Sequence, residues 1–147
     1  MNTTYDFAFS EQGYNHIKAD KVCQDSSGHY SDDLMAVVVV ADGHGSDNYP
    51  RTDRGSSFAV EATITAIREF VKTVEDSVID ISEDSDSYLE QLAKNILANW
   101  YAAVDADLEK YPFSEEELSK VSDKYKKRYM SGQRQEKAYG TTLIAVC

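Results

Sequence analysis

Cysteine, proline and basic residues are all scarce in this chain of 147 residues, which contains two cysteines and two prolines. Cys23 and Cys147 cannot build a disulfide framework, and they lie too far apart in the sequence for a zinc-binding pair. Lys and Arg total 15 against 26 Asp and Glu, so the formal net charge is −11. This acidity argues against surfaces that bind nucleic acid or anionic lipid, because both select clustered Lys and Arg.

Long apolar runs are also missing. The longest, residues 34–41, is far shorter than the roughly 20 residues that a membrane-spanning helix needs. Residues 1–6 lack the basic stretch and apolar core of a signal peptide. Together with the few cysteines, these features predict a cytoplasmic protein without a membrane segment. The apolar content of 41% supports a packed core, and the length predicts a single domain over 1–147.

Strand patterns occur at both ends of the chain. Aromatic and polar residues alternate over 5–10, which predicts a strand with one aromatic face. The valine-rich run 34–41 predicts a strand buried on both faces. Residues 139–146 predict a final strand. Because this strand stops on an apolar run, we expect a domain that is truncated on its C-terminal side and lacks a partner strand.

Helices are predicted between these strands. One covers residues 53–74, where apolar residues recur at three- and four-residue spacing. Two more cover 87–111 and 114–131, after an acidic loop at 75–86. Each of these two opens with capping-box spacing: Ser87 with Glu90, and Ser114 with Glu117. Since the helices form one block instead of alternating with strands, the pattern favours the α+β class.

Asp42 and Gly43 are the clearest candidates for chemistry. Asp42 ends an apolar strand, where a buried charge must be paired or must bind a metal. The flexible Gly43 allows its carbonyl to turn towards the same ion, and such hard oxygen ligands suit Mg²⁺ or Mn²⁺. A simple Asp-Gly turn explains these two residues equally well. Asp25 is a second candidate, although it precedes residues 26–28, where we expect a turn.

Three clusters, taken together, resemble the metal-dependent serine/threonine phosphatase 2C family. The first runs from His16 to Cys23-Gln24-Asp25-Ser26, the second is the strand with Asp42-Gly43-His44-Gly45, and the third is Gly140-Thr141-Thr142-Leu143. Their order is that of the family, and the Cys-Gln-Asp form is similar to a bacterial branch. The match covers about the N-terminal half of a phosphatase domain.

The resemblance implies a specific fold and reaction. The family fold is an αββα sandwich of two antiparallel sheets flanked by helices, with two Mg²⁺ or Mn²⁺ ions at one end. Asp42 would bridge both ions, the Gly43 carbonyl would bind one, and Asp25 would bind a metal-bound water or ligate weakly. The implied activity is hydrolysis of phosphoserine and phosphothreonine in protein substrates, in which two metals activate water.

The sequence also departs from the family pattern. Gln24 stands where most members have an acid, and Asp20 stands where many have a phosphate-binding arginine. Lys18 or Lys21 could replace that arginine, and His16 could bind phosphate or act as an acid, although a surface histidine is equally consistent. A complete two-metal site also needs later aspartates. We therefore expect little or no activity from this chain alone.

Two further expectations follow from these departures. The alternative to an enzyme is a non-catalytic, phosphatase-like module that binds or regulates. Unpaired strands expose backbone edges and apolar faces, which proteins normally cover. We therefore expect a homodimer that pairs or exchanges strands across a two-fold axis.

Overall fold

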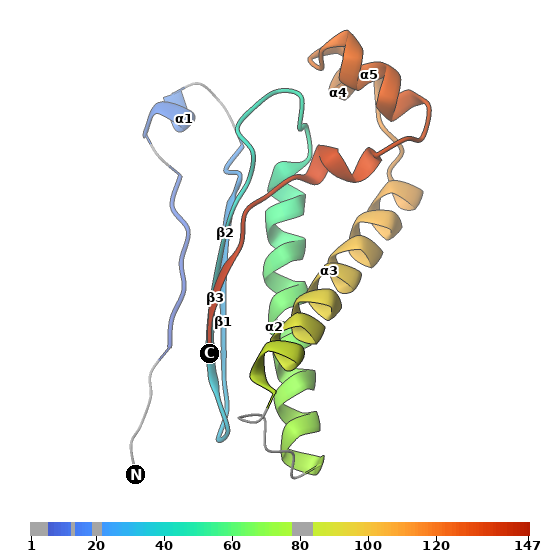
Figure 1. Cartoon of the computed structure of the whole chain (residues 1–147). Coiled ribbons are helices and arrows are strands. Elements are labelled where there is room, and N and C mark those ends of the chain that lie inside the picture. The colour runs from blue at the N-terminus through green and yellow to red at the C-terminus, as the bar shows by residue number, and fades with distance from the viewer. Residues whose placement is uncertain (1–5, 13, 19–21, 78–83) are drawn as a thin grey trace.

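A three-stranded antiparallel sheet with long helices on one side forms the body of the molecule (Figure 1). The computed structural model describes residues 6–12, 14–18, 22–77 and 84–147. The strands are β1 (Asp25–Ser31), β2 (Ala36–Asp42) and β3 (Ile144–Val146), in the order β1-β2-β3. The α+β class is thus confirmed. No second sheet is present within those ranges, so the sandwich remains a prediction.

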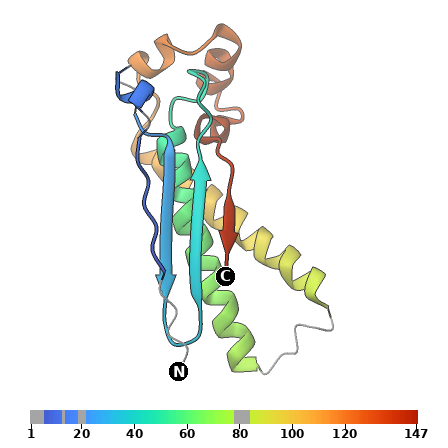
Figure 2. The ribbon, with the colours of Figure 1, turned by 90° about the vertical axis from the view of Figure 1, so that its left-hand side faces the viewer.

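The two long helices are α2 (Thr52–Ser77) and α3 (Ser85–Lys110). Helix α2 packs against β1 and β2, and α3 crosses α2 on the side away from the sheet (Figures 1 and 2). The remaining helices are short: α1 (Tyr14–Lys18), α4 (Glu115–Ser119), α5 (Asp123–Met130) and the 3₁₀ helix η1 (Gln135–Tyr139). In the part of the chain that the structure describes, no helix is long and apolar enough to cross a membrane.

Strand β2 is buried on one face only. Val37 and Val39 pack in the core beneath α2, as does Ala41. The alternate residues Val38 and Val40 point to the other face, where they are 37% and 52% exposed. The prediction of a strand buried on both faces was therefore wrong for the described structure, because helices cover one side of the sheet and leave an apolar strip on the other.

Strand predictions near the N-terminus were wrong in two places. In the predicted strand 5–10, residues 6–10 form no strand, because the contacts that Asp6 and Ser10 make to β1 are side-chain hydrogen bonds; residue 5 lies outside the described residues. The turn expected at 26–28 is the middle of β1. Backbone pairing with β2 over seven residue pairs overrides the turn preference of Ser and Gly there.

Helix boundaries also differ from the predictions. The first helix is confirmed, but α2 extends through residues 75–77 and α3 already begins at Ser85. The predicted acidic loop is thus shorter than 75–86, and its centre, 78–83, lies outside the described residues. The predicted third helix is divided into α4 and α5. Its interruption has a clear cause, because the Ser122 backbone N–H donates to Asn48 Oδ1 (3.0 Å) and not to a helical carbonyl.

The C-terminal strand is shorter than predicted. Residues 135–139 form η1, and β3 covers only Ile144–Val146. Between them, Thr141 forms an isolated bridge with Gly43. The capping box at Ser114 is confirmed: Ser114 Oγ accepts from the Glu117 N–H at 3.2 Å, and Glu117 Oε2 accepts from the Ser114 N–H at 2.8 Å.

A buried ion pair joins the start of α2 to α4. Arg51 is 2% exposed, and its Nε and Nη2 donate to the two carboxylate oxygens of Glu117 at 2.7 and 3.1 Å. Burial opposes ionisation of Glu117, but hydrogen bonds from Arg51 and from Ser114 outweigh it and lower the pKa of Glu117 to about 2. Ionised Glu117 therefore stabilises the folded chain.

This ion pair predicts an acid-sensitive stability. The pKa of Glu117 is about 2 in the folded chain, against an ordinary value of 4.5. The stabilisation is therefore complete above pH 4.5 and is lost as the pH falls from 4.5 towards 2. Thermal unfolding across this window should show a flatter pH dependence for Glu117→Gln than for the wild type. The exposed neighbour variant Glu116→Gln should retain the wild-type slope, and parallel curves for wild type and Glu117→Gln would contradict the expectation.

Candidate functional site

The predicted metal ligands Asp25 and Asp42 face each other at one end of the sheet. They are direct partners in the β1–β2 register. Directly opposite residues in an antiparallel pair place their side chains on the same face, with Cβ atoms about 5 Å apart. This is the face opposite α2, since Asp42 follows the exposed Val38 and Val40 at two-residue intervals. The hairpin thus juxtaposes two exposed carboxylates.

The Gly-Thr-Thr cluster fixes the end of β2. The Asp42 carbonyl accepts the Thr142 N–H at 2.8 Å, the Thr141 hydroxyl at 2.9 Å and the Thr142 hydroxyl at 3.3 Å. Segments about 100 residues apart in sequence therefore meet at the candidate ligand. All three hydrogen bonds are made to the Asp42 backbone carbonyl and none to its carboxylate. They therefore hold the backbone in place and leave the carboxylate uninvolved.

Gly43 lies in a cradle that no larger residue would fit. Its N–H donates to the Gln24 carbonyl at 3.2 Å. A Cβ at position 43 would lie 2.5 Å from that carbonyl oxygen and 3.0 Å from Thr52 Cβ. Glycine is required here by close packing between the first cluster and the start of α2. The predicted first and second clusters are thus in direct contact.

His44 connects the same loop to the C-terminal helices. Its N–H donates to the Gly140 carbonyl at 3.1 Å, and its ring contacts the edge of Tyr49 at a centroid distance of 4.9 Å. The Tyr49 and Tyr125 hydroxyls hydrogen-bond at 3.2 Å, which extends the contact to α5. The loop after Asp42 is therefore held from two sides.

Asp25 and Asp42 line a hollow of about 430 Å³, here called the acidic hollow. Segment 9–11 forms a wall that sequence reasoning missed, and Ile144 of β3 lies at the other side. The complete lining is Phe9, Ser10, Glu11, Asp25, Ser26, Ser27, Val40, Ala41, Asp42, Thr142 and Ile144. Three of these described residues are acids and none is a base.

The predicted phosphate-binding residues are only partly placed by the structure. His16 and Lys18 belong to α1, which lies at the end of the sheet where β1 begins and β2 ends (Figure 1). Lys18 is exposed and does not line the acidic hollow. Lys21 and Asp20 lie outside the described residues. A role for His16, Lys18 or Lys21 in holding phosphate therefore stays a prediction.

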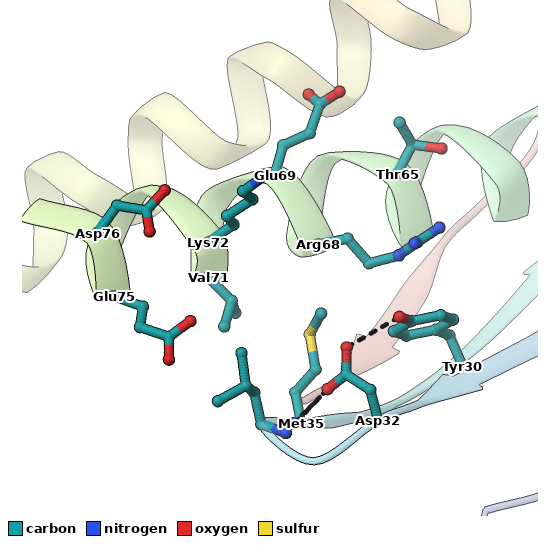
Figure 3. Close-up of a pocket in the computed structure, with 11 residues that line it drawn as sticks. Tyr30, Asp32, Met35, Thr65, Arg68, Glu69, Val71, Lys72, Glu75 and Asp76 are labelled. Atoms are coloured by element: carbon teal, nitrogen blue, oxygen red, sulfur yellow. Dashed lines mark hydrogen bonds between the residues drawn. The ribbon is translucent and has the colours of Figure 1, made fainter.

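A second hollow, of about 480 Å³, lies at the opposite end of the hairpin, between the β1–β2 turn and α2 (Figure 3). The Arg68 guanidinium lies over the Tyr30 ring at 4.1 Å, and the Tyr30 hydroxyl donates to Asp32 Oδ2 at 2.8 Å. Asp32 also accepts the N–H groups of Leu34 and Met35. None of the predicted site residues lines this hollow.

The donor set at the acidic hollow fits a divalent ion in part. Asp25 and Asp42 supply carboxylates, and the Gly43 backbone follows directly, so the donors are the hard oxygens that Mg²⁺ and Mn²⁺ prefer. Within the described ranges, no group of three or more His, Cys, Asp or Glu side chains is placed to hold an ion. The candidate donors among the described residues are therefore two carboxylates and a backbone carbonyl.

One comparison with known proteins found a match to a family model. Residues 12–147 match the family model for protein phosphatase 2C, a range that includes all three clusters. No curated protein and no solved structure matched the chain. The matched range spans well over half of the sequence, and the chain therefore belongs to the protein phosphatase 2C family.

Proposed function

We propose that this domain acts in the metal-dependent hydrolysis of phosphoserine and phosphothreonine in proteins. The observation that carries the proposal is the register pairing of Asp25 with Asp42 at one end of the hairpin. Hydrogen bonds from Thr141 and Thr142 hold the Asp42 backbone there. Family membership supports a phosphoprotein as the substrate.

Asp25, Asp42 and the Gly43 carbonyl are the residues that would hold Mg²⁺ or Mn²⁺. A divalent cation supplies Lewis-acid chemistry for phosphoester hydrolysis. Hydrogen bonds from Thr141 and Thr142 hold the Asp42 backbone, and close packing against Gln24 and Thr52 fixes the Gly43 backbone that follows it. Two carboxylates offset only two of the four positive charges of a two-metal centre. We therefore propose weak binding and weak turnover by these residues alone.

One observation favours a non-catalytic module as the second candidate. Where most family members have an acid, Gln24 carries a neutral amide, which adds no negative charge beside Asp25. No third acidic, His or Cys ligand joins the pair among the described side chains. A single weakly held ion would suit recognition of phosphate more than its hydrolysis.

Association between copies of the chain also remains part of the proposal. Val40, Ile144 and Val146 form an apolar strip that is 52%, 67% and 62% exposed. Strand β3 pairs only with β2 among the described strands, so its other edge is open. An exposed apolar face beside an open edge supports the expected homodimer.

Substitution of Asp42 should weaken Mn²⁺ binding. Asp42→Asn retains the size of the side chain but removes the charge, so we expect at least a tenfold rise in the dissociation constant measured by calorimetry, on the order of 1.4 kcal/mol or more. Asp33→Asn makes the same exchange at the exposed turn of the same hairpin and should bind like the wild type. Equal affinity of Asp42→Asn and wild type would contradict the proposed site.

A further inference from the structure

The N-terminal segment 6–12 runs antiparallel to β1 without joining the sheet. Asp6 Oδ2 lies 2.6 Å from His29 Nδ1, and the Ser10 hydroxyl donates to Ser27 Oγ at 2.9 Å. Residue numbers rise along the N-terminal segment while those of its contact partners fall along β1, as expected for antiparallel segments. Figure 2 shows this segment beside β1 over its whole length. Two side-chain contacts thus set the register of the N-terminal segment on β1.

The first of these contacts is the stronger anchor. The Asp6 side chain is only 8% exposed in its pair with His29. Hydrogen bonds from Ser31 and from His29 lower the pKa of Asp6, so the carboxylate is ionised at neutral pH. A charge-assisted hydrogen bond of 2.6 Å fixes this end of the segment.

This register places Phe9, Ser10 and Glu11 in the wall of the acidic hollow, beside Asp25 and Asp42. Glu11 is exposed and Phe9 is 74% exposed, so both face incoming molecules. No basic side chain occurs in the described lining. An anionic phosphate that enters the hollow therefore meets the negative charge of Glu11 at its rim, and the described lining supplies no basic side chain to attract it.

We propose that Glu11 selects substrates with a basic residue next to the phosphorylated one. This inference rests on the proposed phosphatase function and concerns the specificity of the same site. In the proposed site, Asp25 and Asp42 would hold a cation that lies between them and the phosphate. Of the three acids in the described lining, Glu11 would then be the one that meets the substrate directly. A flanking Arg or Lys pairs with Glu11 and offsets its repulsion of the phosphate, and Phe9 offers the stem of that side chain an apolar contact.

The test measures binding of two peptides to the full chain in the presence of Mn²⁺. Both carry a non-hydrolysable phosphonate analogue of phosphoserine, and they differ only in Arg or Gln at the flanking positions. Fluorescence anisotropy should show that the wild type prefers the Arg peptide about fivefold, as a partly exposed ion pair allows. Glu11→Gln should lose this preference. Glu116→Gln removes the same charge from α4 and should keep it.

The outcomes separate this inference from the proposed function. Equal affinity for both peptides in the wild type, or an unchanged preference in Glu11→Gln, would overturn the role of Glu11. If binding is then still lost in Asp42→Asn, the proposed function stands. Failure of the wild type to bind either peptide would overturn both.

Discussion

Replacement of Arg51 by methionine is expected to lower the free energy of unfolding by about 3–5 kcal/mol, because it leaves the partly buried Glu117 carboxylate and the polar groups around Arg51 without their donor. Arg51 donates to both oxygens of Glu117, to the Tyr111 carbonyl at 2.7 Å and to the Tyr139 hydroxyl at 2.7 Å. Its guanidinium also lies 4.3 Å from the centre of the Phe113 ring. For a chain of this length the midpoint of thermal unfolding should fall by roughly 10 °C.

A matched surface variant tests whether burial is the cause. Lys94 and Glu90 form an ion pair at 2.8 Å, but their side chains are 63% and 69% exposed. Lys94→Met should therefore change the free energy of unfolding by less than about 0.5 kcal/mol. The double variant Arg51→Met with Glu117→Gln should be more stable than the sum of the single effects, because it removes both charges. A cost for Arg51→Met similar to that of Lys94→Met would refute the assignment.

Substitution of Gly55 by alanine should destabilise the chain by about 3 kcal/mol, although alanine normally stabilises a helix interior by about 1 kcal/mol. A Cβ at position 55 would lie 1.8 Å from the Tyr139 carbonyl oxygen and 2.6 Å from the Tyr139 carbonyl carbon. Backbone atoms cannot rotate away as a side chain can. Helix α2 or η1 would have to shift, and the Gly55 carbonyl would lose its hydrogen bond from Trp100 Nε1 (3.0 Å).

Urea unfolding measures this effect directly, and Ser57→Ala is the control two residues further along α2. Without a backbone neighbour to displace, Ser57→Ala should leave stability unchanged or raise it by a few tenths of a kcal/mol, about the difference in helix propensity. Because Tyr139 directly precedes the Gly-Thr-Thr cluster, Gly55→Ala should also weaken Mn²⁺ binding. A stable Gly55→Ala variant with wild-type affinity would contradict the close packing of α2 against the Tyr139 backbone.

The long helices could be predicted because their patterns are local. Apolar spacing identified α2, and the capping box identified the start of α4 at Ser114. Strand β1 could not be found in this way, since Asp-Ser-Ser-Gly-His-Tyr-Ser offers almost no apolar side chain. It is a strand because β2 supplies its backbone partners. The interruption before α5 was equally hidden, because it depends on Asn48, 74 residues away.

The same distinction between local patterns and long-range contacts applies to the residues of the candidate site. Asp42 and Gly43 could be chosen because an acid and a glycine end an apolar run. That Asp25 is the direct partner of Asp42 could not be seen without β1. Glu11 was missed because side-chain hydrogen bonds between distant residues, and no sequence pattern, bring it to the wall of the hollow. The hydrogen bond from the Thr141 hydroxyl to the Asp42 carbonyl could not be predicted for the same reason, because the two residues are far apart in the sequence.

The turn at Asp32 sets how β1 and β2 are aligned at the opposite end of the hairpin, where Asp25 and Asp42 lie. Asp32 accepts hydrogen bonds from Leu34 and Met35 at 2.9 and 3.0 Å and from Tyr30 at 2.8 Å, so it determines where the chain reverses. Residues 26–31 of β1, at about 3.3 Å each, lie between Asp25 and this turn, a distance of roughly 20 Å. Reversal one residue earlier or later would slide the strands and rotate one carboxylate to the opposite face. The turn at the far tip of the hairpin therefore sets the position of Asp25 relative to Asp42. A substitution in this turn can change that position without replacing any residue of the candidate site.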